Sequence, residues 1–256
     1  ADAITFCNHP KLVMHVDFNQ RLWDRVGKEQ PSGPTPSFNA WLSKGLPPWS
    51  LVRTDLDEGL TYGARHPSAS SGTISIWIYP YYDLHNVHPP GVDAGLGIYE
   101  IAHIKLQQPG HVHLLHRAFN DGLGRGSGLE IYDGVNPGAT NLWRGLLTDL
   151  PTSPLPINQW TPLVATYDLK LKKIQLYING QPRTLNTHST PFAAPGAGMK
   201  EVRVGGREQG TRFLNWNSTF QGAMDELMLF SKVLSDAEVK ALHSWQSKKP
   251  TCSPIP

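Results

Sequence analysis

The histidines of this chain are concentrated in one stretch. Six of the eleven are His85, His88, His103, His111, His113 and His116. In the segment HVHLLH, His111 and His113 are two residues apart, so on a β-strand their side chains share a face. With His103 from a paired strand as a third ligand, two such imidazoles suit zinc or copper. The same group suits proton abstraction beside a sugar carboxylate.

The alternative for these histidines is a polar, solvent-facing strand, and the residue types alone do not separate the three interpretations. Two facing imidazoles leave the coordination shell of a transition metal short of protein ligands. We therefore predict that His111 and His113 do not form a tight transition-metal site.

Aromatic residues in segments rich in turn signals are a second set of candidates. We expect ligand-binding roles for Trp41, Trp49, Tyr82, Trp143 and Trp216. Sugar rings present apolar faces that stack on such side chains. The alternative is that these aromatics fill the core or dock a partner protein.

The two cysteines, Cys7 and Cys252, lie near opposite ends of the chain and have no metal-binding spacing. If the termini meet, one disulfide closes the fold; otherwise both are free thiols. The sequence begins Ala-Asp-Ala, without Met or an apolar leader, as a mature chain does after signal removal. We therefore expect a secreted or periplasmic protein with a Cys7–Cys252 disulfide.

Composition excludes several classes of function. The net charge of +2 gives no basic footprint for nucleic acid, and no apolar run is long enough for a membrane span. Only 17% of the residues are charged, whereas the chain has 24 Gly and 22 Pro. This balance favours many short elements joined by turns.

Hydrophobic periodicity predicts that these elements are mostly strands. Residues 72–82, GTISIWIYPYY, alternate between isoleucines on one face and Trp77 and Tyr79 on the other. The alternation of Leu12, Met14, Val16 and Phe18 predicts a half-buried first strand. About a dozen such segments precede one short helix, which begins with the capping box Ser235–Glu238 and carries Val239, Leu242 and Trp245 on one face.

Residues 160–180, WTPLVATYDLKLKKIQLYING, predict a hairpin that ends in a tight Asn179-Gly180 turn. We expect Trp160, Tyr167 and Tyr177 to serve packing and cross-strand pairing rather than chemistry. The whole pattern predicts an all-β protein, an antiparallel sandwich or barrel, formed by one domain over residues 1–256.

The order of the motifs adds a family resemblance. HVDFNQRLWDRVG, GTISIWIYPY, the 160–180 hairpin, VRVGG and FQGAMDELMLFSKVLSDAEVKAL occur in succession between about residues 11 and 245. This order resembles the laminin-G-like, concanavalin-A-like jelly-roll superfamily, and most of all its bacterial LamG-type domains. The resemblance is weak over residues 80–150. It implies an antiparallel two-sheet β-sandwich with one short C-terminal helix.

The resemblance also implies a metal. Similar proteins often hold one structural Ca²⁺ where the first and last strands meet, bound by carboxylates and backbone carbonyls. The matching positions are Asp225 and, less surely, Asp17, with Asp24 as a third carboxylate nearby in sequence. The alternative for Asp225 is that it only accepts backbone hydrogen bonds at a strand end.

The catalytic signatures of this fold are absent. Glycosidases on it carry three acidic residues at alternate positions of one strand. Here Glu130 and Asp133 would point to opposite faces of a strand, and Asp225 and Glu226 are adjacent. The strand motifs of alginate-type lyases on this fold are missing too, and EIAHIKLQ resembles them only distantly. No P-loop, nucleophile elbow or HExxH motif occurs.

Three functions therefore stay open. The first is a secreted non-catalytic binding module for glycans. The second is an accessory or adhesion subunit whose loops at 27–50 and 80–96 contact a partner protein. The third is a polysaccharide lyase on the same fold. None of the three involves nucleic acid or a membrane span.

Overall fold

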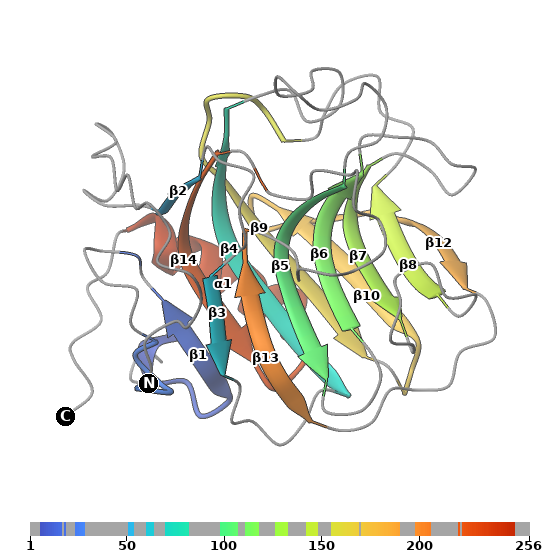
Figure 1. Ribbon diagram of the computed structural model, residues 1–256, viewed down its shortest axis with the longest axis horizontal. Helices are drawn as coiled ribbons and strands as arrows, with labels where there is room; N and C mark the ends of the chain where they lie inside the picture. The colour runs from blue at the N-terminus through green and yellow to red at the C-terminus, as the bar shows by residue number, and fades with distance from the viewer. Residues whose placement is uncertain are drawn as a thin grey trace.

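The computed structural model describes residues 6–16, 18, 24–28, 51–53, 60–63, 70–81, 98–106, 111–117, 126–132, 142–147, 155–168, 170–189, 198–205, 220 and 222–248. Within these ranges the chain forms two seven-stranded antiparallel sheets, a short 3₁₀ turn η1 (Phe6–Asn8) and one helix, α1 (Asp236–Ser247). Figure 1 shows the sheets as two layers, with β5, β6 and β7 crossing in front of β4 and β9. The predicted two-sheet sandwich with one C-terminal helix is confirmed.

The first sheet, called sheet I, contains the first and the last strand, β1 and β14. Its strands are, in spatial order, β1 (Leu12–Val16), β14 (Gly222–Phe230), β4 (Ser71–Pro80), β9 (Thr161–Asp168), β10 (Lys173–Ile178) and β11 (Gln181–Arg183). The short strand β2 (Leu51–Arg53) also pairs with β14. The strand alternation in residues 72–82 and the 160–180 hairpin therefore both belong to sheet I.

The second sheet, sheet II, contains the histidine-rich segment. Its spatial order is β12 (Asn186–Ser189), β8 (Leu142–Leu147), β7 (Gly126–Tyr132), β6 (His111–Arg117), β5 (Ile98–Leu106), β13 (Met199–Val204) and β3 (Leu60–Gly63). The strands β5 and β6 pair antiparallel, as the sequence predicts. The short strands β2, β3, β11 and β12 were not predicted, because three or four residues are too few for a periodic signal.

The core lies between the sheets and follows the alternation of the strands. Ile74, Ile76 and Ile78 of β4 are fully buried in it, and the opposite layer supplies the equally buried Val112 and Ile131. Because successive side chains on a strand point to opposite faces, the residues between these core positions face outward.

Helix α1 covers the outer face of sheet I. A second apolar cluster joins the two and contains Phe6, Leu12, Val164, Tyr177, Met228, Phe230, Leu234, Val239 and Leu242, with Trp245 packed against it. The predicted apolar face of the helix is confirmed. The expectation of a half-buried first strand is wrong, since all five residues of β1 are buried. Leu12 packs in the cluster with α1, whereas Val13, Met14 and Val16 all belong to the core between the sheets, with an irregular register between Leu12 and Met14.

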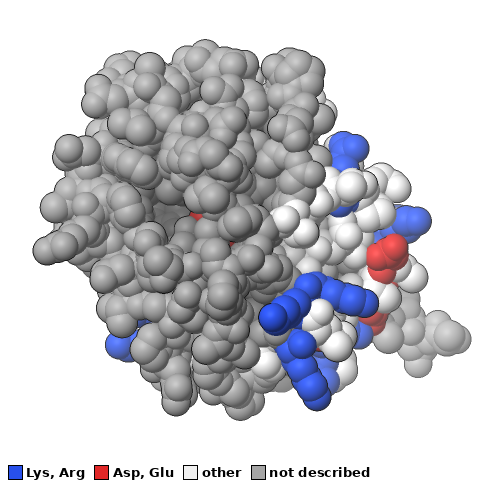
Figure 2. Space-filling view, turned by 90° about the vertical axis from the view of Figure 1, so that its right-hand side faces the viewer, with Lys and Arg blue, Asp and Glu red and all other residues white. Residues whose placement is uncertain are grey.

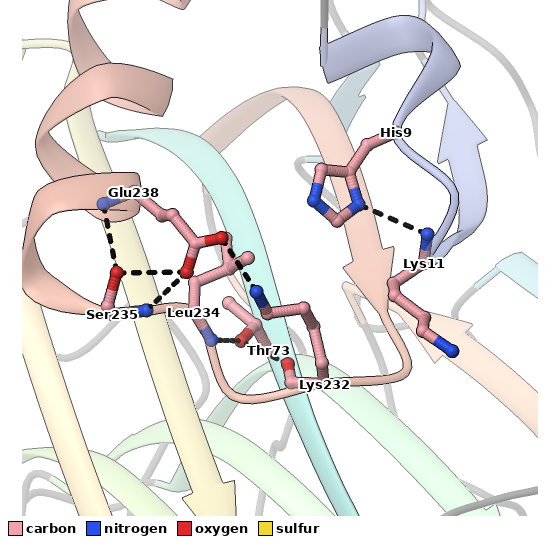
Figure 3. A network of polar contacts seen from close by, with 7 residues as sticks. All are labelled: His9, Lys11, Thr73, Lys232, Leu234, Ser235 and Glu238. Carbon is pink, nitrogen blue, oxygen red and sulfur yellow. Dashed lines mark hydrogen bonds and ion pairs between the residues drawn. The ribbon is translucent and has the colours of Figure 1, made fainter. Parts of the chain in front are cut away.

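Polar contacts fix where α1 begins (Figure 3). The predicted capping box is present: Ser235 Oγ accepts from the Glu238 N–H, and Glu238 Oε2 accepts from the Ser235 N–H at 2.8 Å. Thr73 Oγ1 donates to the Lys232 carbonyl at 2.7 Å and accepts from the Leu234 N–H at 3.0 Å. These bonds tie the connection between β14 and α1 to strand β4.

The hairpin between β9 and β10 forms as predicted. Its strands pair from Lys173 opposite Asp168 to Ile178 opposite Leu163. In the turn that follows, Asn179 and Gly180 both have positive φ, 54° and 70°, which these residue types tolerate. Among the described residues, no helix is long and apolar enough to cross a membrane.

Candidate functional site

A row of polar positions crosses the outward face of sheet II. His113 on β6 stands opposite His103 on β5 and opposite Glu130 on β7. The same register continues to Arg203 on β13 and Arg144 on β8. The neighbours of His113 along β6, Val112 and Leu114, are core residues. The row therefore lies on the face of sheet II that is turned away from the core.

Three side chains of this face are buried although they do not belong to the core. Glu130 is 0% exposed, His113 4% and His111 7%. The rings of His111 and His113 lie 5.6 Å apart between centroids, tilted by 40°. The alternative of a solvent-facing histidine strand is therefore wrong. A carboxylate is costly to bury unless other groups compensate it, so the position of Glu130 is a specific feature of this face.

Figure 2, which views the molecule from the side where β8 and β12 lie, shows acidic side-chain atoms below the outer surface. Clefts that exclude bulk water and contain a few oriented polar groups are the usual form of small-ligand sites. We take the outward face of sheet II around His113 and Glu130 as the candidate site.

The other histidines have different positions. His116 faces the core side of β6, is fully buried, and lies 2.8 Å from Ser127 Oγ through Nδ1, which is a packing role. His103 occupies the register position next to His113. His85 and His88 lie outside the described residues. Among the described residues, no group of three or more metal-binding side chains surrounds a common point, and the prediction against a tight transition-metal site still awaits elemental analysis.

One of the two predicted calcium ligands is described by the structure. Asp225 lies on β14 opposite Trp77 of β4 and is 2% exposed. Its Oδ1 accepts a hydrogen bond of 2.8 Å from the N–H of Glu226. Glu226 has a positive φ of 51° at an irregularity of the strand, and its Oε2 lies 3.1 Å from His15 Nε2 on β1. Asp17 lies outside the described residues.

The third carboxylate, Asp24, has a structural role. Its Oδ1 accepts from the N–H groups of His15 and Val26, and its Oδ2 accepts from the N–H of Gly27, each at 3.0 Å. These bonds hold the turn at residues 24–28 against β1. Tyr62 is also close, since its pKa is raised first by burial and then by the charge of Asp24.

The predicted aromatic ligands are mostly beyond what the structure describes. Trp41, Trp49, Tyr82 and Trp216 lie outside the described residues, as does Cys252. Trp143 lies in strand β8 opposite Ile131, so its expected place in a loop is wrong. Cys7 lies in η1. The ligand-binding role of these aromatics and the disulfide stay predictions.

Sequence reasoning missed the pairing of His113 with Glu130. On its own strand, Glu130 is followed by Asp133 and lacks the alternating acidic residues of a glycosidase. The available signal was the antiparallel succession of HVHLLH and SGLEIY, but the register between two strands is not readable from either strand alone.

Solved structures with the same architecture include binding domains. Domain 4 of AbnA, a GH43 extracellular arabinanase from Geobacillus stearothermophilus, in complex with arabinotriose, is 19% identical with a TM-score of 0.61, covering 91% of this chain and 98% of that one. The binding domain of botulinum neurotoxin serotype D is 15% identical with a TM-score of 0.56, covering 92% and 51%. The binding domain of Paraclostridial Mosquitocidal Protein 1 is 15% identical with a TM-score of 0.55, covering 91% and 52%.

At such identities the likeness concerns the fold alone. This chain spans about half the length of the two toxin domains. Comparison with curated proteins gives no match.

The sequence also matches a family directly. Residues 103–240, just over half of the chain, match the laminin G family that is described as the concanavalin A-like lectin/glucanases superfamily. The match includes all of β6, β7 and β14, and thus both His113 and Glu130. The chain belongs to the concanavalin A-like lectin/glucanase superfamily.

Proposed function

We propose that this chain is a non-catalytic carbohydrate-binding module. The observation that carries the proposal is the set of buried polar side chains, Glu130, His113 and His111, on the outward face of sheet II. Sugar hydroxyls are recognised by oriented donors and acceptors in partly desolvated sites, and a carboxylate beside imidazoles supplies both.

The fold comparisons are consistent with this ligand class. The arabinanase domain was solved with arabinotriose, and the toxin domains are named as binding domains. These ligands are properties of those proteins. For this chain they support a search for glycan ligands and give no identity for the sugar.

A glycan array followed by calorimetry tests the proposal. Glu130→Gln keeps the shape of the side chain but removes the charge, and we expect at least a tenfold loss of affinity for the glycans that bind at this face of sheet II. His113→Asn is the second variant. Glu238→Gln, on α1 beyond the other sheet, is the matched control and should bind as the native chain does.

Thermal melting of each variant separates loss of binding from loss of fold. No glycan binding by the native chain, or full affinity of a folded Glu130→Gln variant for every glycan that the native chain binds, overturns the proposed role of this face. Appearance of unsaturated products during incubation would replace binding by lyase chemistry. Capture of a protein partner through an unaffected surface would favour the accessory-subunit alternative.

We further propose one structural calcium ion held by Asp225 and Asp17. Asp24, Asp225 and Glu226 lie near the junction of β1 and β14, although no three metal-binding side chains of the described residues surround a common point there. His15 lies beside Glu226, and three backbone N–H groups bind Asp24. Hard carboxylate oxygens are the ligands that Ca²⁺ prefers.

A secreted or periplasmic location completes the proposal. It rests on the Cys7–Cys252 disulfide, because disulfides persist in oxidising compartments. No free cysteine occurs in the part of the chain that the structure describes, which supports the pairing.

A further inference from the structure

A group of aromatic rings lies at one end of sheet I, away from the candidate site on sheet II. Tyr79 and Tyr81 are two residues apart at the end of β4, so they project to the same side. Thr161 of β9 pairs with Ile78, and one further step along this register brings Trp160 opposite Tyr79. The centroid of the Tyr79 ring lies 5.9 Å from that of Tyr81, in a T-shaped contact, and 5.5 Å from that of Trp160, in a tilted one.

The rings stand just past the part of sheet I that helix α1 covers. Trp77, two residues earlier on the same face, stacks on His243 of α1 with ring centroids 6.2 Å apart, and its indole nitrogen is buried. Like Trp77, the side chains of Tyr79, Tyr81 and Trp160 are half-buried. The outer face of the sheet thus contacts α1 at Trp77, and solvent partly reaches the rings from Trp77 to Tyr81.

The polar atoms of these three rings are available to a ligand. Within the described part of the chain, no hydrogen bond engages the hydroxyl of Tyr79, the hydroxyl of Tyr81 or the indole N–H of Trp160, and none of these atoms is buried. Burial and the neighbouring Tyr79 raise the pKa of Tyr81, so its hydroxyl stays protonated at neutral pH.

The segment that carries Trp160 is held in place. Leu155 is fully buried, and the N–H of Asn158 donates to the carbonyl of Pro80 at 2.8 Å. Beside these anchors Ile157 is 45% exposed, and the side chains of Asn158 and Gln159 are exposed. A surface that is fixed before the ligand arrives loses less conformational entropy on binding.

We propose that Tyr79, Tyr81 and Trp160 form a second carbohydrate subsite that takes a neutral sugar ring. The apolar face of a pyranose or furanose packs on the aromatic rings, while its hydroxyls meet the phenols, the indole N–H and the amide groups of Asn158 and Gln159. This subsite rests on the proposed function for its ligand class and is a separate surface on the other sheet.

Two observations favour a neutral sugar over other occupants. Residues 155–160, Tyr79 and Tyr81 include no charged side chain, so a uronate or sulfated sugar would find no cation here. The group is also small. A stable protein interface uses about 20–30 residues a side, whereas this surface offers six, namely Tyr79, Tyr81, Ile157, Asn158, Gln159 and Trp160.

Calorimetry and NMR titration with cellotetraose and xylotetraose test the subsite. We expect Tyr81→Ala and Trp160→Ala to weaken binding at least tenfold, and Trp160→Phe, which keeps an aromatic face, to weaken it less than threefold. Trp245→Ala is the matched control, because Trp245 is a half-buried tryptophan that packs against α1's own cluster. It should leave the affinity unchanged. Thermal melting checks that each variant is folded.

The Glu130→Gln background separates this inference from the proposed function. Neutral-sugar binding that persists in Glu130→Gln and is lost on adding Trp160→Ala supports the subsite. If the folded Tyr81→Ala and Trp160→Ala variants keep full affinity, the subsite is overturned and the proposed function stands. If the native chain binds no sugar, both are overturned. Self-association that depends on Tyr81 and Trp160, without sugar binding, would show that a second copy of the chain occupies this surface and would also overturn the inference.

Discussion

The hydroxyl of Tyr177 on β10 donates a hydrogen bond of 2.7 Å to Oδ1 of Asp236, the first residue of α1. Burial, and then the bond to Asp236, raise the pKa of Tyr177, so the phenol remains a donor over the physiological range. The bond joins the hairpin to the helix that covers it.

Tyr177→Phe should therefore weaken the attachment of α1. The ring stays, the donor is lost, and Asp236 is exposed enough to be rehydrated, so we expect the free energy of unfolding to fall by about 1 kcal/mol. Urea denaturation measures this. Asp236→Asn keeps an acceptor and should cost less. An equal loss in both variants would indicate that the charge at the helix N-terminus matters, not the bond.

Glu238 should make stability depend on acid pH. Burial raises its pKa, but hydrogen bonds from Lys232 and Ser235 outweigh this and lower the pKa from 4.5 to about 2. The folded-state pKa is thus below the unfolded one. The contribution of Glu238 is present above pH 4.5 and is lost as the pH falls towards 2. Denaturation midpoints of native protein and Glu238→Gln should differ at neutral pH and converge below pH 4.5. A difference that is constant over the whole range would contradict this.

Tyr167→Phe should stabilise the protein. Tyr167 is 1% exposed, and its hydroxyl is buried without a hydrogen-bond partner among the described residues. Removing a buried, unsatisfied hydroxyl relieves a desolvation cost of about 1–3 kcal/mol. An increase in the free energy of unfolding is the expected result, and a decrease would show that the hydroxyl has an unseen partner such as an internal water.

Gly72 offers a companion test of the same contact. A Cβ at Gly72 would lie 2.6 Å from the Tyr167 hydroxyl and 2.8 Å from the ring carbon that bears it. Gly72→Ala should therefore destabilise the sandwich, and Tyr167→Phe should recover part of the loss in the double variant. Strict additivity in this double-mutant cycle would mean that the two side chains do not touch.

Calcium should raise the melting temperature through Asp225. An ion that binds only the folded state adds about 2.7 kcal/mol when its free concentration is a hundredfold above the dissociation constant. Chelation of calcium-loaded protein should lower the melting temperature, and the effect should shrink in Asp225→Asn and, less strongly, in Asp17→Asn. Asp24→Asn controls for general damage at this junction. An unchanged melting temperature after chelation of verified calcium-loaded protein would refute the ion.

Cys7 and Cys252 should be found linked. Mass spectrometry of the alkylated native protein is expected to detect no modified thiol until a reductant is added. Closing so long a loop is worth about 4–5 kcal/mol in the loop-entropy estimate, so Cys7→Ser should lower stability markedly. Alkylation of both thiols in the native protein would refute the disulfide.

The fold was predictable because its signals are local. The alternation of Ile74, Ile76 and Ile78, the Asn179-Gly180 turn and the Ser235–Glu238 capping box each lie within a few residues, and the structure contains all three. The first strand was misjudged for a reason that is not local. Its first residue, Leu12, is buried in the cluster with α1, more than 200 residues later, and periodicity on one strand carries no information about what will cover it.

The sites were less predictable because they depend on register. His113 meets Glu130, and Tyr79 meets Trp160, only through the pairing of strands that are separate in sequence. For Trp160 the expected cross-strand pairing is present, but the exposed part of its ring has no sequence signal. For Asp24 the reason is different: its three hydrogen bonds to backbone N–H groups show a turn-forming role that a count of carboxylates does not reveal.

Strand β11 has a consequence for how the molecule behaves at high concentration. It is the last strand of sheet I, and all three of its residues, Gln181, Pro182 and Arg183, are exposed. An open strand edge is a template for aggregation, but this one is three residues long, contains a proline that cannot donate a hydrogen bond, and ends in a charged side chain. Sheet I thus ends in a strand that resists extension by a neighbouring chain, and Pro182 and Arg183 act as gatekeepers against fibril growth from this edge.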